Sequence, residues 1–414
     1  MTSEHRYDRT PDGSVWTQTM GTYQSWVRYL EVFDHVSVAA RVREIDKVSD
    51  DWKRADGDGI CFIPVPNYHG PLQYLLNSRQ VRRAVQGVIR PTDALILRLP
   101  SQLAACINSE LLNTGHPYGV EVVGDPYDVF SLGAMRHPLR PFFRWWFSTM
   151  LRKQCARSCA AAYVTKETLQ HRYPCSNLMF CFSDVELPEE AFKTKNSIIR
   201  PWNSLLKQDT RKNMGIDSQV RLIFVGTLAQ LYKAPDILIE ALTLCIINEG
   251  LNLHLNVLGD GKYRQWLEKK AEKYGIGRHV AFLGQVLSGE TVRSYLDQAD
   301  LFVLPSRQEG LPRAMIEAMA RGLPCIGTNV GGIPELLPEE DIIPPNDRKS
   351  LARKICEVVK DPERMGRMSI RNYEKAKEYK DEILRERRIA FYLEVRHRMQ
   401  DWLNDGKNNQ DPFR

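Results

Sequence analysis

The chain of 414 residues lacks the features of a membrane-spanning or secreted protein. No apolar run reaches the roughly 18 residues needed to cross a bilayer. The opening stretch, MTSEHRYDRTPDG, has no apolar core of a signal peptide. Its nine cysteines, an odd number, predict reduced thiols rather than a disulfide framework. We therefore expect a cytoplasmic protein.

The chain also lacks a large excess of positive or negative charge. The net charge is +6, and residues 1–200 carry 24 Lys and Arg against 21 Asp and Glu, so neither half has the strongly basic balance typical of nucleic-acid binding. No acidic motif indicates a metal. Cys155 and Cys159 lie one helical turn apart, but they have no companion ligands. The sequence thus predicts neither a nucleic-acid partner nor a bound metal.

The order of apolar runs predicts an α/β protein. A chain of this length is expected to form two domains of about 200 residues each. Strand-like runs alternate with helix-like stretches throughout, and they lie at 35–41, 60–65, 94–99, 119–123, 221–225, 251–258, 280–284 and 301–304. We predict two doubly wound, Rossmann-like domains at 1–195 and 196–380, followed by a helix at 381–403.

The most informative stretch, 301–337, reads as strand, helix and strand. Pro312 is expected at the first helical position, where its missing N–H costs nothing, and Gly322 ends the helix. A second strand begins near Pro324. Such a unit of a parallel sheet opens a ligand pocket at the carboxyl ends of its strands.

Two carboxylates mark this pocket. Glu309 lies in the loop ahead of the helix, and Glu317 follows about 7–8 Å further along it, at ~1.5 Å per residue. The helix N-terminus between them offers unpaired N–H groups and a partial positive charge, which suit a phosphate. A diphosphate at the helix start, sugar hydroxyls near Glu309 and a ribose near Glu317 would together span one nucleotide sugar.

The residues that flank the two glutamates make the pattern specific. It comprises Pro305-Ser306, Glu309-Gly310, Glu317-Ala318-Met319, Gly322-Leu323-Pro324 and Gly331-Gly332-Ile333-Pro334-Glu335. It resembles the donor site of retaining GT-B glycosyltransferases, in the large family, group 1 or family 4, whose signature is two glutamates separated by seven residues. The resemblance covers about 221–337 closely, whereas the first domain is matched mainly by its order of elements.

The resemblance implies a retaining, metal-independent transfer of a sugar from a UDP- or GDP-linked donor to a hydroxyl acceptor. Glu309 would orient the donor sugar, Gly310 and Leu311 would present backbone N–H groups, and Glu317 would hold the ribose. No catalytic base is required, because the departing phosphate can deprotonate the incoming hydroxyl. In this fold the last helix commonly crosses back to the first domain.

A second loop would hold the diphosphate. It begins with Gly226 and Thr227, and Lys233 matches the lysine with which the family clamps the donor. The chain departs from the family at two positions: many members have an arginine at the place of Thr227 and a glycine at that of Ala234. The clamp therefore lacks one charge.

Acceptor-side residues are expected at loops of the first domain. Asp125 stands where the family often places a polar residue facing the reacting sugar. His69 follows a strand and would contact an acceptor, with a surface turn histidine as the alternative. Arg98 would meet an anionic acceptor, or it is partly buried against carboxylates.

The family normally begins with a strand that runs into a glycine loop, yet residues 1–20 are polar and rich in turn residues. Gly21 stands where that loop would end, ahead of an amphipathic helix from about Ser25. We expect an irregular segment in place of the first strand, or a chain shortened at its start.

A basic, aromatic segment at 136–172 indicates a membrane surface. It carries eight basic residues against one acid, Glu167, together with the aromatics Phe142, Phe143, Trp145, Trp146 and Phe147. A basic helix with exposed tryptophans would rest on an anionic bilayer, whereas aromatics on a core face would be the alternative. Contact with the inner membrane face would fit a carbohydrate or lipid-linked acceptor in surface polysaccharide or glycolipid synthesis.

Two other functions stay open. A sugar-nucleotide epimerase can share this architecture and would convert the donor without an acceptor. A non-catalytic nucleotide-sugar-binding subunit would fit the missing arginine and the irregular N-terminus.

Overall fold

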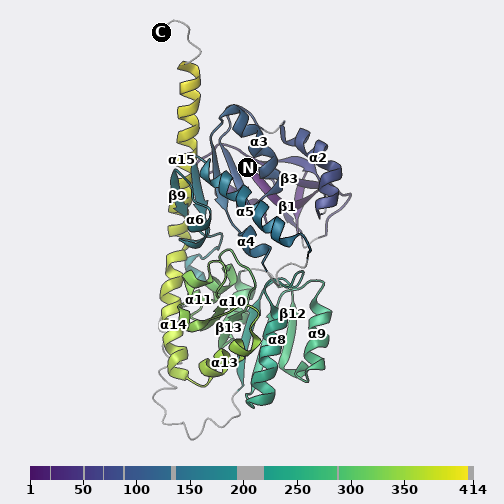
Figure 1. Cartoon of the computed structure of the whole chain (residues 1–414), viewed down its shortest axis with the longest axis vertical. Coiled ribbons are helices and arrows are strands. Elements are labelled where there is room, and N and C mark those ends of the chain that lie inside the picture. Colours follow the sequence, from purple (N-terminus) through teal and green to yellow (C-terminus); the bar gives the residue numbers. More distant parts are fainter. Residues whose placement is uncertain are drawn as a thin grey trace. The chain divides into compact units, whose positions relative to one another are not determined.

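A computed structural model describes residues 1–18, 20–49, 52–68, 70–86, 89–131, 137–193, 219–286 and 289–408. The chain divides into two compact units (Figure 1). The first comprises Met1–Gly124, Phe147–Phe182 and Arg385–Arg414, and the second comprises Asp125–Trp146 and Ser183–Leu384.

The first unit contains two groups of strands. In one, β5 (Ile60–Pro66), β3 (Val36–Glu44) and β1 (Thr2–Arg9) are parallel, and β2 (Val15–Thr17) and β4 (Lys53–Arg54) extend the edge in antiparallel fashion. In the other, β6 (Leu95–Leu99), β7 (Tyr118–Val122), β8 (Ala160–Tyr163) and β9 (Leu178–Cys181) are all parallel. The helices that begin in this unit are α1 (Tyr23–Val27), α2 (Gly70–Gln86), α3 (Gln102–Thr114) and α6 (Thr168–Arg172).

The expectation that residues 1–20 contain no strand is wrong, because β1 pairs with β3 along its whole length apart from one irregularity. Tyr7 is fully buried, and so is Thr2, whose hydroxyl accepts a hydrogen bond from the Arg98 N–H at 3.0 Å. Polar side chains that find partners inside the unit can thus occupy an inner strand. A search for alternating apolar residues misses such a strand.

The long C-terminal helix α15 (Asp381–Asn408) belongs to the first unit from Arg385 onward. The Tyr392 ring lies 4.6 Å from that of Tyr29, and Arg396 donates a hydrogen bond to the carbonyl of Val32 at 3.0 Å. Aromatic packing and this capped carbonyl fix the helix against the segment that follows α1.

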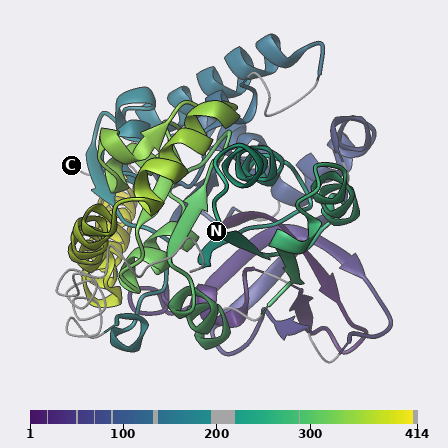
Figure 2. The ribbon, with the colours of Figure 1, turned by 90° about the horizontal axis from the view of Figure 1, so that it is seen from below.

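The second unit holds one sheet of six parallel strands in the order β12 (Val280–Gly284), β11 (Leu253–Leu258), β10 (Val220–Val225), β13 (Leu301–Leu304), β14 (Cys325–Thr328) and β15 (Ile342–Ile343). Figure 2 shows helices on both sides of these green strands. The helices and short turns are α4 (Pro126–Val129), α8 (Pro235–Thr243), η3 (Leu244–Asn248), α9 (Arg264–Lys273), α10 (Glu290–Asp297), α11 (Arg313–Ala320), α12 (Ile333–Leu336), α13 (Arg348–Val359) and α14 (Pro362–Ala376). Helix α5 (Arg140–Ala156) begins in this unit.

The positions predicted for β10, β11, β12 and β13 agree with the structure to within two residues, since their sequences either are apolar runs or alternate apolar with polar residues. Pro312 differs slightly from expectation: it is the residue just before α11, in an extended conformation, rather than the first residue of the helix.

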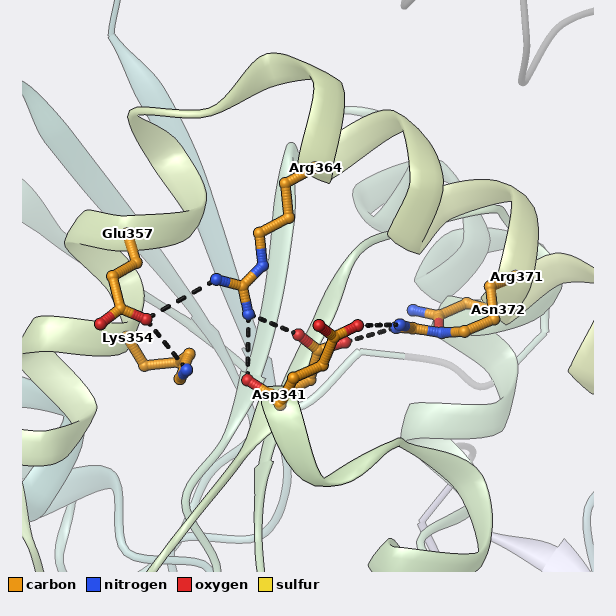
Figure 3. A network of polar contacts seen from close by, with 7 residues as sticks. Asp341, Lys354, Glu357, Arg364, Arg371 and Asn372 are labelled. Atoms are coloured by element: carbon orange, nitrogen blue, oxygen red, sulfur yellow. Dashed lines mark hydrogen bonds and ion pairs between the residues drawn. The ribbon is translucent and has the colours of Figure 1, made fainter.

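A buried carboxylate anchors α14 (Figure 3). Asp341 is fully buried and accepts hydrogen bonds from Arg364 at 2.9 Å and Arg371 at 2.5 Å. Arg364 also lies 3.6 Å from Glu357 of α13. Two arginines on one helix therefore compensate a charge next to the edge strand β15.

Within the described ranges, no helix combines the length and the apolar character needed to cross a membrane.

Candidate functional site

The strand order of the second unit locates a ligand site. From β10 the chain moves outward to β11 and β12, and from β13 it moves the other way to β14 and β15. The order reverses between the neighbours β10 and β13. In open parallel sheets, ligands bind outside the carboxyl ends of the strands at such a reversal. The loops after β10 and β13 carry the predicted donor residues.

The loop after β10 is shaped by glycines. A Cβ on Gly226 would lie 2.3 Å from Cδ of Lys233, so glycine leaves space for the lysine stem. A Cβ on Gly259 would lie 1.9 Å from the Gly226 carbonyl oxygen, and one on Gly261 would lie 2.1 Å from the backbone nitrogen of Ala229. The turn after β11 thus packs backbone to backbone against the turn that begins at Gly226.

An ion pair joins the two loops. Nζ of Lys233 lies 2.9 Å from Oε1 of Glu309, which also accepts a hydrogen bond from the Ser306 hydroxyl at 2.7 Å. The two charged side chains are 14% and 8% exposed, so solvent screens them little. Burial acts to lower the pKa of Lys233, but the Glu309 charge outweighs it and the pKa lies above its ordinary value. Lys233 is therefore charged at neutral pH.

Arg307 supports the Lys233–Glu309 pair, although the sequence analysis did not identify it. Its guanidinium donates to both carboxylate oxygens of Asp236, at 2.9 and 2.7 Å, and its backbone N–H donates to the Tyr232 carbonyl at 2.6 Å. Its Nε also donates to the Asn346 side-chain oxygen at 2.7 Å. These contacts fix the turn that carries Lys233. The one sequence signal is the position of Arg307 directly after Pro305-Ser306 at the end of β13.

Backbone donors follow Glu309. The N–H groups of Gly310 and Leu311 make no hydrogen bond within the described residues. The Gly310 carbonyl accepts from Gly332 at 2.6 Å, and a Cβ on Gly331 would lie 2.0 Å from the Glu309 carbonyl oxygen. The double glycine after β14 therefore holds the loop in place while its N–H groups stay available ahead of α11.

Glu317 lies on α11 and is half-buried. Its carboxylate accepts no hydrogen bond from the part of the chain that the structure describes. Burial raises the pKa of Glu317, and Arg313 partly offsets this. No contact joins Glu317 directly to the Lys233–Glu309 pair. A carboxylate that accepts no hydrogen bond from the described residues suits a ligand whose hydroxyl groups donate hydrogen bonds.

The two departures from the family pattern have different surroundings. The Thr227 hydroxyl accepts a hydrogen bond from the Ala229 N–H at 3.1 Å and thereby closes the turn. Ala234 adopts φ 54° and ψ 45°, the left-handed conformation that favours glycine. The missing arginine removes a charge, whereas the missing glycine leaves backbone strain at the start of α8.

The predicted acceptor-side residues lie elsewhere. In the first unit, Gly21 has φ 75° and its Cβ would meet the Tyr7 hydroxyl at 2.1 Å, and Arg98 pairs with buried Glu121 at 2.9 Å. Asp125 belongs to the second unit, where its carboxylate caps α4 by accepting from the Tyr127 N–H at 2.9 Å. His69 lies outside the described residues. The catalytic role of Asp125 and the acceptor roles of Gly21, His69 and Arg98 stay predictions.

The start of α5 is an exposed aromatic surface, which we call the α5 face. It consists of Leu139, Phe142, Trp145 and Trp146, which are 56%, 49%, 61% and 51% exposed. Beside it, the Arg144 guanidinium lies 3.4 Å from the centre of the Tyr127 ring. The alternative that these aromatics form a core face is therefore wrong for this turn of the helix.

No group of three or more His, Cys, Asp or Glu side chains within the described ranges is arranged to hold a metal ion.

Residues 207–375 match the family described as glycosyl transferases group 1. Over 337 residues, 81% of this chain and 80% of the relative, the chain is 26% identical to the protein CapJ of Staphylococcus aureus. It is 35% identical over 158 residues to the putative teichuronic acid biosynthesis glycosyltransferase TuaC of Bacillus subtilis, a match that covers 37% of this chain and 36% of that protein.

The solved structure of HepE from Anabaena, in complex with UDP and glucose, aligns with a TM-score of 0.58 at 15% identity. The alignment covers 94% of this chain and 97% of HepE. At this identity the likeness shows the fold alone, and that fold is the GT-B fold expected from the sequence.

Proposed function

Because the chain belongs to the group 1 glycosyltransferases, we propose that it transfers a sugar from a nucleoside diphosphate sugar to a hydroxyl acceptor with retention and without a metal ion. The observation that carries the donor site is the Lys233–Glu309 pair at the reversal point of the sheet. A lysine held charged beside unpaired backbone N–H groups is suited to a diphosphate.

Each group has one task in this proposal. Lys233 binds the diphosphate and offsets the charge that grows on it as the bond to the sugar breaks. The N–H groups of Gly310 and Leu311 bind anionic or hydroxyl oxygens. Glu309, oriented by Ser306, accepts hydrogen bonds from the donor sugar, and Glu317 accepts them from the ribose. The departing phosphate oxygen takes the proton of the acceptor hydroxyl, so position and charge supply the catalysis.

The names of similar proteins favour a carbohydrate product. TuaC is named for teichuronic acid biosynthesis, and HepE was solved with UDP and glucose. We propose that this chain uses a UDP- or GDP-linked donor and builds a surface polysaccharide or glycolipid.

The α5 face supports work at a membrane surface. Leu139 directly precedes α5, and Phe142 and Trp146 follow at intervals of three and four residues, so that these two lie on one side of the helix. Amphipathic tryptophans sit well at the headgroup level, and arginines attract anionic lipid. We propose that the protein is cytoplasmic and rests on the inner membrane face, where a lipid-linked acceptor is reached without leaving the bilayer.

A screen of donors tests the transferase function. Wild type, Glu317→Ala and the control Glu272→Ala, an exposed residue of α9, are titrated with UDP-, GDP- and ADP-sugars, and the products are identified by mass spectrometry. We expect one donor to bind and to be slowly hydrolysed by wild type and the control, with much weaker binding to Glu317→Ala.

Other outcomes identify the alternatives. Conversion of the donor into a sugar epimer without any acceptor would indicate an epimerase. Tight donor binding with no hydrolysis and no transfer to any acceptor would indicate a non-catalytic binding subunit, which the missing arginine at Thr227 also fits. The absence of binding by wild type would contradict the donor site itself.

A further inference from the structure

Tyr232 is a polar side chain of the donor loops to which the proposed mechanism gives no task. It directly precedes Lys233 in the turn after β10 and is half-buried. In that turn the mechanism uses only the ammonium group of Lys233, because Thr227 stands where many members of the family have an arginine. A further hydrogen-bond donor in the same turn would therefore bear on how the diphosphate is bound.

The main chain at Tyr232 is bonded to the loop that carries Glu309. The Tyr232 carbonyl accepts a hydrogen bond from the Arg307 N–H at 2.6 Å, and the carbonyl of the preceding Leu231 accepts one from the Arg307 guanidinium. The same guanidinium binds both carboxylate oxygens of Asp236. These bonds fix the point from which the Tyr232 side chain leaves the backbone.

The Tyr232 ring lies beside the Lys233–Glu309 pair. Nζ of Lys233 is 5.5 Å from the centre of the ring, within the range of a cation–π interaction. The same Nζ is 2.9 Å from Oε1 of Glu309. The phenol hydroxyl is attached to this ring, so it lies in the neighbourhood of the ammonium group to which we assign the diphosphate.

The charged groups that act on the Tyr232 hydroxyl come from three places in the second unit. Lys233 belongs to the same turn, Glu309 to the loop after β13, and Arg313 is the first residue of α11. Burial raises the pKa of Tyr232, Lys233 and Arg313 lower it, and Glu309 raises it, with a net shift upward. The hydroxyl therefore keeps its proton at neutral pH and can donate a hydrogen bond.

This proton has no acceptor in the part of the chain that the structure describes, where the Tyr232 hydroxyl makes no hydrogen bond. A half-buried hydroxyl of this kind bonds to water or to a ligand. An ionised phosphate offers acceptor oxygens and no donor, and hydrogen bonds to a charged acceptor are the stronger ones. The hydroxyl therefore matches the ligand that we assign to Lys233.

The position of Glu309 distinguishes the two phosphates of that ligand. In the proposed arrangement Glu309 binds the donor sugar, so the phosphate nearest to it is the one bonded to that sugar. Tyr232 flanks the same Lys233–Glu309 pair. Its hydroxyl is thus closer to the phosphate that carries the sugar than to the one that carries the nucleoside.

We propose that the Tyr232 hydroxyl donates a hydrogen bond to the sugar-bearing phosphate of the donor and, without a charge, takes over part of the role of the arginine missing at Thr227. This inference rests on the proposed transferase function and adds a donor-binding residue to it. As the bond to the sugar breaks, negative charge grows on this phosphate and strengthens the hydrogen bond. Tyr232 keeps its proton throughout, because the proton of the acceptor hydroxyl goes to the departing phosphate oxygen.

Calorimetric titration with nucleotides tests this role in wild type, Tyr232→Phe and the control Tyr274→Phe. UDP and GDP carry the second phosphate, and UMP and GMP lack it. We expect Tyr232→Phe to bind the preferred diphosphate about tenfold more weakly than wild type, the loss of one hydrogen bond to a charged group, and to bind the corresponding monophosphate equally well.

Tyr274→Phe is a matched control. Tyr274, at the end of α9, is half-buried like Tyr232, and its ring centre lies 5.4 Å from Nζ of Lys270. The control therefore removes a phenol hydroxyl beside a lysine outside the donor loops. It should bind every nucleotide like wild type.

Two further measurements separate the hydroxyl from the ring. Tyr232→Phe keeps the ring beside Lys233 and loses no hydrogen bond to the described residues, so it should melt at the wild-type temperature or above. In donor hydrolysis its kcat should fall about tenfold with a smaller change in KM, because the bond strengthens in the transition state. Tyr232→Leu also removes the ring and should bind the diphosphate more weakly than Tyr232→Phe.

The outcomes distinguish this inference from the proposed function. Equal diphosphate binding by wild type and Tyr232→Phe would overturn the role of the hydroxyl and leave the transferase function standing, even if Tyr232→Leu binds weakly. An equal loss of diphosphate and monophosphate binding in Tyr232→Phe would also overturn the assignment to the sugar-bearing phosphate. If wild type binds neither UDP nor GDP, the donor site itself is contradicted, and the role of Tyr232 with it.

Discussion

At the scale of single residues, the ribose-binding role that we propose for Glu317 would come at a cost in stability. Its half-buried carboxylate has a raised pKa and no hydrogen bond from the described residues. A carboxyl whose pKa is higher in the folded than in the unfolded state contributes stability at low pH, and this is lost as the pH rises through the folded-state value. The ionised form needed for ribose binding is therefore the less stable one.

We predict that Glu317→Gln raises the KM for the donor about 10- to 100-fold, because a neutral amide replaces a charged acceptor. Its free energy of unfolding at pH 7 is expected to equal or exceed that of wild type. Urea unfolding and donor titration measure the two effects.

Unfolding between pH 4.5 and 7 provides the control. Wild type should lose stability relative to Glu317→Gln as the pH rises above 4.5, the ordinary pKa of the group. Glu272→Gln, at an exposed site, should follow wild type. A Glu317→Gln protein that is clearly less stable at neutral pH would contradict this account.

Variants of the Lys233–Glu309 pair can distinguish its contribution to stability from its contribution to donor turnover. Lys233→Met leaves a buried carboxylate without its counter-charge, and we expect a loss of about 3–5 kcal/mol in the free energy of unfolding. The double variant Lys233→Met/Glu309→Gln should recover most of this loss but no donor turnover. Denaturant unfolding together with hydrolysis rates measures both. Recovery of turnover in the double variant would remove Lys233 from the diphosphate site.

At the scale of elements, the start of α8 carries strain. Ala234 has φ 54°, a conformation that costs an L-residue about 1–2 kcal/mol and glycine little. We predict that Ala234→Gly is more stable by about 1–2 kcal/mol than Ala241→Gly, a change at an equally buried alanine inside the same helix. Thermal unfolding of the two variants compares them, and equal losses would exclude the strain.

The anchor of α14 depends on Asp341. Asp341→Asn leaves Arg364 and Arg371 without their buried counter-charge, and we predict a loss of about 3 kcal/mol. Glu340→Gln alters an exposed pairing to the same Arg371 and should cost less than about 1 kcal/mol. Chemical unfolding of both variants gives the comparison, and similar values would mean that burial of the charge is unimportant.

Elements rich in apolar residues were predictable, and polar ones were not. Strands β10 to β13 are short stretches rich in apolar residues, so hydropathy finds them, whereas the two-residue strand β15 was not predicted. Strand β1 was missed because Thr2, Ser3 and Asp8 are buried through hydrogen bonds and ion pairs that join distant parts of the chain. Its irregularity at Glu4 and His5 leaves no sequence signal.

At the scale of the whole molecule, the α5 face should control association with membranes. We predict that Trp145→Ser/Trp146→Ser weakens binding to vesicles that contain phosphatidylglycerol by about tenfold or more, because two interfacial tryptophans are lost. Co-sedimentation measures the bound fraction.

Two controls belong to this experiment. Trp266→Ser removes another exposed tryptophan, on α9, and should bind vesicles like wild type. Vesicles of phosphatidylcholine alone should bind wild type weakly, because arginines find no anionic lipid. Equal binding of all variants would exclude the α5 face as the membrane surface.

For the whole chain, motif reasoning identified residues that the fold brings together, but not the side chains that support them, and donor binding by these residues stays a prediction. Gly226, Lys233, Glu309 and Gly310 come together at one reversal of the sheet, as the resemblance implied. Arg307 was missed, since a buried bidentate contact to Asp236 arises only in the folded chain. The predicted domain boundaries at 195 and 380 stay predictions.

The glycines of the donor loops also decide where this chain can be diversified. At Gly259, Gly261 and Gly331 any side chain would collide with backbone atoms. Nearly all members of a saturation library at these positions would therefore misfold. At Gly226 the collision is with the flexible stem of Lys233, which can shift. Of these four positions, Gly226 is therefore the one where a substitution would first move the side chain of Lys233 rather than the backbone.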